Sequence, residues 1–481
     1  MTVTDLPFPA TSRPASPASL PARLPARLPA GESPYQSYVY AYPHKTAYRP
    51  LAPRPRLAAL WAEEPKHALS LYAHIPFCEV RCGFCNLFTR IGAPDGLSTA
   101  YLDALDRQAA RTAEALAAGT GGEPRFAQAA FGGGTPTFLT ADELARLCDI
   151  MEHRLGADLR AVPLSVEASP STATADRLAV LAERGATRLS LGVQSFVAAE
   201  ARAAVRPQHN ADVEAAIARV RAAGIPVLNL DLIYGIDGQT PASWRQSLDA
   251  ALAFEPEELY LYPLYVRPLT GLGRRTEGDA SSAVDADRAW DAQRLALYRQ
   301  GRDHLLASGY EQVSMRMFRR SASPQAGGTE YCCQTDGMVG LGCGARSYTR
   351  ALHYSFDYAV STAEVRGIVD DYVARPAEDF AFAEVGFAMT PDEARRRHLV
   401  QSLLQAEGLD TGDYRARFGS DPAADFSPEL TRLHERGWLD ADAAPSSRIR
   451  LTAEGLAHSD AIGPAFFSGP VRAAMAAYEA R

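Results

Sequence analysis

Three cysteines of the 481-residue chain stand close together in the segment CEVRCGFC. The spacing C-x3-C-x2-C puts Cys78, Cys82 and Cys85 on one short loop. Three thiolates on such a loop can bind three irons of a cubane [4Fe–4S] cluster and leave the fourth iron open to an exogenous ligand. Structural zinc normally takes four ligands in paired short spacings, and no second Cys or His pair stands nearby. The spacing therefore predicts an iron–sulfur cluster on these three residues.

The other four of the seven cysteines have less definite roles. Cys148 lies in the segment RLCDIMEHRL, whose periodicity predicts a buried helix position. Cys332, Cys333 and Cys343 fall in the glycine-containing stretch YCCQTDGMVGLGCGARSY. A thiol there could donate a hydrogen atom, bind a substrate, or simply be buried, as free cysteines often are. These three are candidate catalytic residues, and both interpretations stay open.

Short apolar runs alternate with Ala/Leu-periodic helical segments from Ser70 onward. This alternation is typical of βα units that close into a parallel barrel or sheet. In such folds the chemistry sits at the carboxyl ends of the strands, and the cysteine loop directly follows the first run. Six strands are predicted between Leu71 and Tyr265, in the runs LSLYAHIPF, AQAAFGG, LSVEAS, ATRLSLGV, IPVLNLDLIYG and EELYLYPLY.

The segments around this repeating unit differ in composition. Residues 1–34 are rich in Pro and Ala and offer little to bury, so we expect a disordered tail. Residues 35–69 begin with the tyrosine-rich YQSYVYAYPHKTAYRPL, which could form a surface arm or a flap that packs over a pocket. Residues 70–275 would form the barrel, and residues 276–389 a region that covers the substrate. Residues 390–481 contain a Thr-capped amphipathic helix, then helix, turn, short strand pair and helix, which predicts a winged-helix-like α+β module.

Charge and hydropathy exclude several classes of protein. The chain has 49 basic and 57 acidic residues and a net charge of -8, which argues against nucleic acid or an anionic membrane as the main partner. Acidic residues spread through the C-terminal module likewise favour a structural role over DNA binding. No run of about 18 apolar residues and no secretory signal are present, so we expect a cytoplasmic protein with reduced thiols. Only Lys45 and Lys66 are lysines, which we attribute to codon bias.

The chain resembles the radical S-adenosylmethionine (SAM) superfamily, and specifically its oxygen-independent coproporphyrinogen III oxidase-like branch. The matching motifs occur in order from about Leu71 to Tyr348, and a weaker likeness continues in LLQAEGLDTGDYRARFG and RIRLTAEGL. The resemblance implies a partial (β/α)6 TIM-like barrel that carries the [4Fe–4S] cluster and binds one or two molecules of SAM. The motifs are LYAHIPFCEVRCGFCNLF, FGGGTPTFL, VEASP, RLSLGVQSF, NLDLIYGIDGQT, YPLYVRPLTGL and VGLGCGARSY.

The resemblance also implies which residues bind SAM. The backbone at Gly133 and Gly134, together with Thr135, would approach the methionine amino group closely. The carboxylate of Glu167 would suit the ribose hydroxyls or the ammonium group. The guanidinium fork of Arg206 would bind the methionine carboxylate in a bidentate manner.

Four further residues match family positions around the same cofactor. Gln194 and Asp231 would line it, although Asp231 could instead cap the end of a strand. Tyr72 and Phe84 would pack against it, although aromatic residues beside a metal loop are often part of the core. We therefore expect all four in the cofactor site, with these structural alternatives.

The implied activity is that of a radical SAM oxidoreductase: reductive cleavage of SAM to a 5'-deoxyadenosyl radical, which abstracts hydrogen from an organic substrate. The best single reaction is oxidative decarboxylation of a coproporphyrinogen III-like tetrapyrrole, a step of porphyrin biosynthesis. At two places the sequence departs from the family's motifs, and these differences leave other functions open. The decarboxylating oxidase has a further cysteine where this chain has Leu87, and the haem-chaperone members have a His-Asn pair where this chain has Gly327 and Gly328.

The alternatives are a two-SAM radical C-methylase or cyclopropanase of a specialised pathway, and a non-enzymatic haem chaperone or iron–sulfur module. The expected partners are a small-molecule substrate and an electron donor such as flavodoxin or ferredoxin. We expect no nucleic acid and no membrane partner, and a monomer in solution.

Overall fold

The computed structural model describes residues 33–206, 208–267, 269–275, 283–321, 323, 333, 336–440 and 447–479. The predicted tail therefore lies outside the described residues as far as residue 32. Three positions singled out in the sequence also lie outside them, namely Gly327, Gly328 and Cys332.

Six parallel strands form the centre of one 13-stranded sheet and follow one another in chain order. They coincide with the six predicted runs, and they confirm the α/β fold with a partial barrel. Side chains such as Val166, Leu191 and Leu230 are fully buried in the main core. The strands are β2 (Leu69–Ile75), β5 (Phe126–Gly133), β6 (Leu164–Ala168), β7 (Ala186–Gln194), β8 (Val227–Tyr234) and β9 (Glu258–Pro263).

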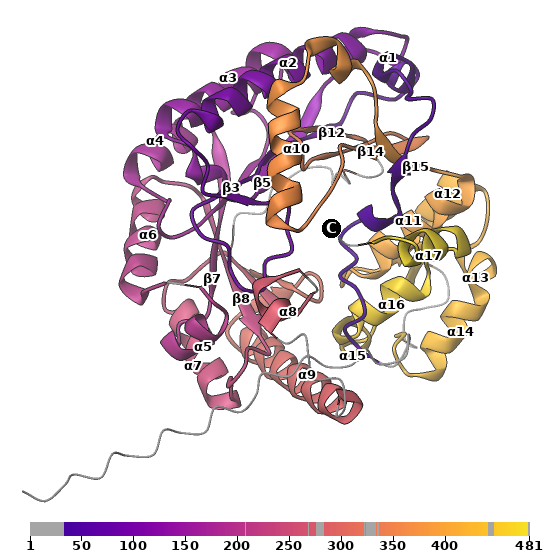
Figure 1. Ribbon diagram of the computed structural model, residues 1–481. Coiled ribbons are helices and arrows are strands. Elements are labelled where there is room, and N and C mark those ends of the chain that lie inside the picture. Colours follow the sequence, from indigo (N-terminus) through magenta and orange to yellow (C-terminus); the bar gives the residue numbers. More distant parts are fainter. Residues whose placement is uncertain are drawn as a thin grey trace, which may run out of the picture.

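Helices return the chain between these strands and cover the outer face of the sheet (Figure 1). The first of them to follow β5 begins at a capping box of Thr140 and Glu143 and ends at Gly156, whose φ is +68°. The helices are α2 (Leu97–Ala117), α3 (Ala141–Leu155), α4 (Ala175–Glu183), α5 (Ala198–Ala203), α6 (Asn210–Ala222) and α7 (Pro241–Leu252). A 3-10 turn, η2 (Pro136–Phe138), and a small parallel sheet of β3 (Phe77–Cys78) and β4 (Arg90–Ile91) complete this part.

Further strands extend the sheet at both edges. A seventh parallel strand, β12, pairs with β2, and antiparallel strands follow on either side. Most come from residues 276–389, which were predicted to cover the substrate. Their runs are two to four residues long, too short for a periodic signal. These strands are β12 (Met338–Leu341), β13 (Arg346–Tyr348), β14 (Leu352–Ser355), β15 (Val385–Ala388) and β1 (Arg49–Pro50) at one edge, and β11 (Met317–Arg320) and β10 (Tyr310–Gln312) at the other.

The helical elements between β9 and β15 come next; α8 lies at the end of the predicted barrel segment, and the others fall within residues 276–389. The longest, α9, packs on α7 and β10. The elements are α8 (Gly271–Arg275), α9 (Ala283–Ala307), α10 (Thr362–Ala374) and η3 (Ala377–Ala381).

The C-terminal module has a hydrophobic cluster of its own, in which Leu403, Tyr414 and Phe466 are buried. A two-stranded antiparallel sheet joins its helices, so the predicted α+β composition is confirmed. None of the helices in the described parts of the chain is long and apolar enough to cross a membrane. The elements are α11 (Pro391–Leu403), β16 (Leu409–Asp410), α12 (Thr411–Phe418), α13 (Pro422–Asp425), α14 (Ser427–Glu435), β17 (Arg448–Ile449), α15 (Ala453–Ala457), α16 (Ser459–Ala465) and α17 (Gly469–Ala476).

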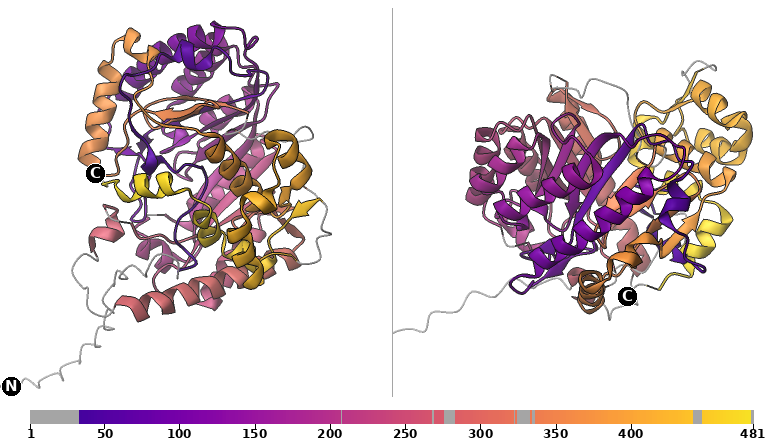
Figure 2. Two further views of the ribbon diagram at one scale, coloured as in Figure 1. Left: turned by 90° about the vertical axis from the view of Figure 1, so that its right-hand side faces the viewer. Right: turned by 90° about the horizontal axis from the view of Figure 1, so that it is seen from above.

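The tyrosine-rich arm runs between the barrel and the C-terminal module (Figure 2). It contains η1 (Lys45–Ala47) and α1 (Leu57–Trp61). The fully buried Tyr42 donates a hydrogen bond to Glu393, which also accepts one from Ser468. These contacts fasten the arm to α11 and to the start of α17.

A buried ion pair fastens the C-terminal module to the edge of the barrel. Arg316 donates to the carboxylate of Asp460, which also accepts the hydroxyl of Tyr265. Asp460 is 1% exposed and Arg316 is 4% exposed. The guanidinium carbon lies 3.8 Å from the ring centroid of Tyr38, so the arm takes part in the same contact.

We expect Arg316→Met to lower the free energy of unfolding by about 3–5 kcal/mol, because it leaves the Asp460 carboxylate buried and unpaired. Chemical denaturation measures the loss, and the double variant Arg316→Met/Asp460→Asn should recover part of it. Arg299→Met is the matched control, because Arg299 and Glu454 pair α9 with α15 at the surface, with side chains 42% and 39% exposed. That pair should contribute no more than about 1 kcal/mol. Equal losses in the two single variants would contradict the role assigned to burial.

Candidate functional site

The cysteine loop begins where β2 ends and is clasped at its base by the pairing of β3 with β4. Its middle is held by Gly83, whose N–H donates to the carbonyl of Ala204 and whose carbonyl accepts from Leu272 N–H. A Cβ on Gly83 would lie 2.8 Å from a methyl carbon of Val205, so only glycine fits there. The loop is therefore fixed at both ends and at its centre.

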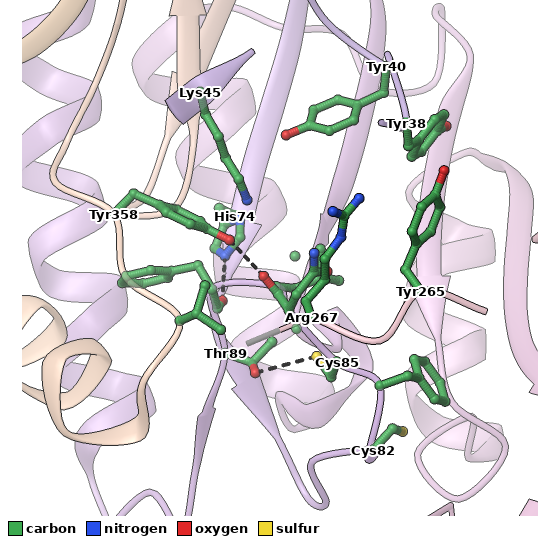
Figure 3. A pocket seen from close by; sticks show the side chains of 18 of the residues that line it. Tyr38, Tyr40, Lys45, His74, Cys82, Cys85, Thr89, Tyr265, Arg267 and Tyr358 are labelled. Atoms are coloured by element: carbon green, nitrogen blue, oxygen red, sulfur yellow. Dashed lines mark hydrogen bonds between the residues drawn. The ribbon is translucent and has the colours of Figure 1, made fainter. Parts of the chain in front are cut away.

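The three thiols of the loop line one cavity of about 1580 Å³. Cys78 Sγ lies 3.3 Å from Thr135 Oγ1, and Cys85 Sγ lies 3.9 Å from the hydroxyl of Thr89. Cys82 Sγ accepts a hydrogen bond from a guanidinium nitrogen of Arg206 at 3.1 Å. Figure 3 shows Cys82 and Cys85 on the loop below this space.

The chemistry of this donor set fits an iron–sulfur cluster. Burial raises the pKa of Cys78 to about 12 and also raises the pKa of Cys85, so both thiolates need a nearby metal charge. Among the described residues, no three His, Cys, Asp or Glu side chains are arranged to hold a single metal ion. Thiolates that each bind a different iron match this arrangement better than a mononuclear site does.

The carboxyl ends of the parallel strands bring the predicted SAM residues to the same cavity. Neighbouring strands point the same way, so residues that follow different strands meet at one edge of the sheet. All nine line the cavity, and they are Tyr72, Phe84, Gly133, Gly134, Thr135, Glu167, Gln194, Arg206 and Asp231. The structure therefore brings together every residue predicted for the cluster and for SAM.

Glu167, at the end of β6, lines the cavity, and its side chain is exposed to that space. Its Oε2 accepts the N–H of Gly133 at 3.1 Å. Removal from bulk water raises the pKa of Glu167 to about 7, and the charge of Asp231 adds to this effect. The carboxyl group can thus change its protonation state near neutral pH.

Asp231, on β8, already has partners from its own sheet. Its two carboxylate oxygens accept hydrogen bonds from Asn229 at 2.8 Å and from Ser190 at 3.1 Å. Burial raises the pKa of Asp231. It therefore has the contacts of a structural carboxylate, the predicted alternative, while it also lines the cavity.

Arg206 ties the cysteine loop to the end of β7. One guanidinium nitrogen donates to Cys82, a second donates to the carbonyl of Gly192, and the third donates to Gln208 at 3.0 Å. Gln194, nearby, adopts a φ of +70°, in the left-handed region that favours glycine. The chain thus bends sharply where β7 enters the cavity.

The glycine motif after β5 packs around His74. A Cβ on Gly133, whose φ is +112°, would lie 2.5 Å from the His74 ring, and a Cβ on Gly134 would lie 2.6 Å from the carbonyl oxygen of Phe77. His74 lies 3.3 Å from the Tyr72 hydroxyl and 3.1 Å from the Phe88 carbonyl. Burial lowers the pKa of His74 to about 4, so the ring is neutral at pH 7.

The candidate catalytic cysteines occupy different surroundings. Cys343 borders the cavity, but it is 1% exposed and its thiol lies 3.8 Å from the hydroxyl of Tyr101 within the core. Cys333 is partly exposed and does not line the cavity, and Cys332 lies outside the described residues. Cys148 is fully buried in α3, at the predicted position.

Sequence reasoning missed four further residues that line the cavity. Tyr40 and Lys45 come from the arm and Arg267 follows β9 (Figure 3), and Arg346 lies on β13. Arg346 donates to the Tyr40 hydroxyl at 3.1 Å. One signal was present in the sequence, because Lys45 is one of two lysines among 49 basic residues.

Comparisons with known proteins agree with this geometry. Residues 72–251 match the family model of the Radical SAM superfamily, and residues 389–458 match that of the HemN C-terminal domain. The oxygen-independent coproporphyrinogen III oxidase of Paracoccus denitrificans is 30% identical over 405 residues, which cover 81% of this chain and 84% of the relative. The Escherichia coli protein of the same name is 28% identical over 441 residues, which cover 87% and 91%.

The heme chaperone HemW of Bacillus subtilis is 26% identical over 392 residues, which cover 80% of this chain and 96% of the relative. Among solved structures, coproporphyrinogen III oxidase (HemN) from Escherichia coli, described as a radical SAM enzyme, superposes with a TM-score of 0.72 at 25% identity. That match covers 90% of this chain and 96% of the other. The chain therefore belongs to the radical SAM superfamily, in its oxygen-independent coproporphyrinogen III oxidase-like branch.

Proposed function

We propose that the protein is a radical SAM oxidoreductase that oxidatively decarboxylates a coproporphyrinogen III-like tetrapyrrole. The observation that carries the proposal is the likeness to the Escherichia coli oxidase over 441 residues, which cover 87% of this chain and 91% of the relative. The cavity adds support, because about 1580 Å³ exceeds the roughly 300–1,000 Å³ of ordinary small-molecule pockets. It has room for SAM and a large second molecule.

When bound, the [4Fe–4S] cluster and SAM supply a 5'-deoxyadenosyl radical. In the proposed reaction a propionate side chain loses one hydrogen atom from the carbon β to its carboxylate, then CO2 and one electron, and becomes a vinyl group. The hydrogen atom goes to the deoxyadenosyl group, and a one-electron acceptor takes the electron. The chain's part is to fix the reacting groups and to exclude water and competing hydrogen donors.

Five residues of the cavity have a part in this proposal. Cys78, Cys82 and Cys85 would hold the cluster, and the Arg206 guanidinium beside Cys82 would pair with the methionine carboxylate of SAM. Glu167 would accept hydrogen bonds from the ribose hydroxyls or the ammonium group.

Radical methylation or cyclopropanation is the second candidate, and Leu87 is the observation that favours it. Leu87 stands where the decarboxylating oxidase has a further cysteine, and it is 48% exposed beside the cavity. A second molecule of SAM would then serve as the methyl or methylene donor. The identity to the heme chaperone HemW also keeps a non-enzymatic role as an outcome of the test.

The deciding experiment supplies the anaerobically reconstituted, reduced protein with SAM and coproporphyrinogen III. We expect CO2, a vinyl product and 5'-deoxyadenosine in matched amounts, measured by mass spectrometry. S-adenosylhomocysteine with a heavier tetrapyrrole would instead identify a methyltransferase. A protein that binds SAM but never forms 5'-deoxyadenosine, with any candidate substrate, is not a radical SAM enzyme.

Cys82→Ala should remove the brown iron–sulfur chromophore and abolish 5'-deoxyadenosine formation, because only two thiolates would remain for the cluster. Iron and sulfide analysis after reconstitution measures the loss. Cys148→Ala is the matched control, because that thiol lies inside α3, away from the cavity. A Cys82→Ala protein with full iron content would contradict the ligand assignment.

SAM affinity should fall as the pH drops from 8 to 6, because the raised pKa of Glu167, about 7, makes the carboxylate the minor form below neutral pH. Glu167→Gln should bind about tenfold more weakly at pH 8, since it loses a charged acceptor, and should vary less with pH. Equilibrium dialysis against unreduced holoprotein gives both values, with the exposed Glu183→Gln as control. Parallel pH profiles for wild type and Glu167→Gln would remove Glu167 from the SAM site.

A further inference from the structure

Lys45 is a basic residue of the cavity that the roles assigned above to the cluster and SAM residues do not include. It starts η1 in the arm, and its side chain is half-buried among the cavity-lining residues. Its Nζ lies 3.5 Å from the ring centroid of Tyr358, a cation–π contact. In Figure 3 the side chain reaches from the arm into the space above the cysteine loop.

No carboxylate in the described parts of the chain balances this charge. Within the described ranges, no Asp or Glu side chain forms an ion pair with Lys45, and the neighbouring charges are those of Arg346 and Cys85. Two acids that border the cavity have partners elsewhere: Ser171 donates to Glu79, and Glu384 pairs with Arg375. Holding a cation in protein without an acidic partner is costly, and burial accordingly lowers the pKa of Lys45 well below its usual range. An anion from outside the chain would favour the charged amine, so the site suits an anionic ligand.

The backbone around Lys45 is fixed before any ligand binds. The Lys45 carbonyl accepts the N–H of Tyr48 at 3.1 Å, and His44 caps the turn through Thr46, with 2.8 Å between Nδ1 and Oγ1. Arg49 donates to the carbonyl of Thr46 and to that of Ala474 in α17. The amine is therefore presented at one defined place, as a recognition group needs to be.

Three cations that line the cavity, Lys45, Arg267 and Arg346, form a cationic cluster. The charges of Arg267 and Arg346 both act on His44, next to Lys45, and that of Arg346 also acts on Lys45 itself. An anionic substrate suits this cluster.

We propose that Lys45 is a substrate-binding residue that pairs with a carboxylate of the substrate and orients it above the cluster loop. The identity of that substrate as a porphyrinogen polycarboxylate rests on the proposed function. Lys45 is thereby a specificity-determining residue supplied by the arm, and it selects acids over uncharged analogues of the same shape.

The test measures binding of coproporphyrin III and of its tetramethyl ester to anaerobically reconstituted protein, by equilibrium dialysis in one buffer. Neither compound needs to react, so binding is separate from catalysis. The wild type should prefer the acid to the ester, and Lys45→Met should bind the acid about tenfold or more weakly while its ester affinity stays within about twofold. Lys45→Arg should restore part of the loss, and Arg54→Met, an exposed arm cation outside the cavity, should behave as wild type.

Three results would overturn the inference: a wild type that does not distinguish acid from ester, an acid affinity of Lys45→Met within about twofold of wild type, or a loss of iron in Lys45→Met. The last would assign Lys45 to the cluster. The expected binding contrast without decarboxylation of coproporphyrinogen III supports Lys45 and rejects the proposed function. Decarboxylation with equal kcat/KM in wild type and Lys45→Met would support the proposed function and reject the role of Lys45.

Discussion

Hydrogen bonds between neighbouring parallel strands, from β2 across to β9, hold the strands' carboxyl ends at one edge of the sheet. The side chains that can do chemistry follow those ends. A cysteine loop after β2, a glycine turn after β5 and Glu167 at the end of β6 are far apart in sequence, yet they meet because their strands share a direction. Antiparallel pairing at any of these positions would carry its residues to the opposite edge.

The arm and the C-terminal helix α17 cover the space at this edge of the sheet. The arm and the end of α17 both border the cavity, and they hold each other through Tyr42, Glu393 and Ser468. Radical chemistry needs such enclosure, because water and stray hydrogen donors would quench a reactive intermediate. The buried ion pair of Arg316 and Asp460 also helps to enclose the cavity. It joins the C-terminal module to the barrel where Tyr38 of the arm also packs.

The charged groups inside the cavity have defined neighbours. Arg206 contacts Cys82, Glu167 has a pKa raised to about 7, and Asp231 is satisfied by Asn229 and Ser190. Each of these groups acts on its neighbours at short range. The cationic cluster of Lys45, Arg267 and Arg346 would attract an acidic substrate.

By itself the sequence determined the six central strands, the cysteine loop and the residues that follow each strand, because those signals are local: short apolar runs, helix caps and a C-x3-C-x2-C spacing. It did not reveal strands β12 to β15, and it left open whether the arm is a surface arm or a flap over a pocket. Those strands are three to four residues long and form only by pairing with distant partners. Lys45 looked like an accident of codon usage until the fold placed it in the cavity beside Tyr358. Tertiary structure decided the cavity's cationic cluster, because Lys45, Arg267 and Arg346 come from segments far apart in the sequence and come together only through long-range contacts.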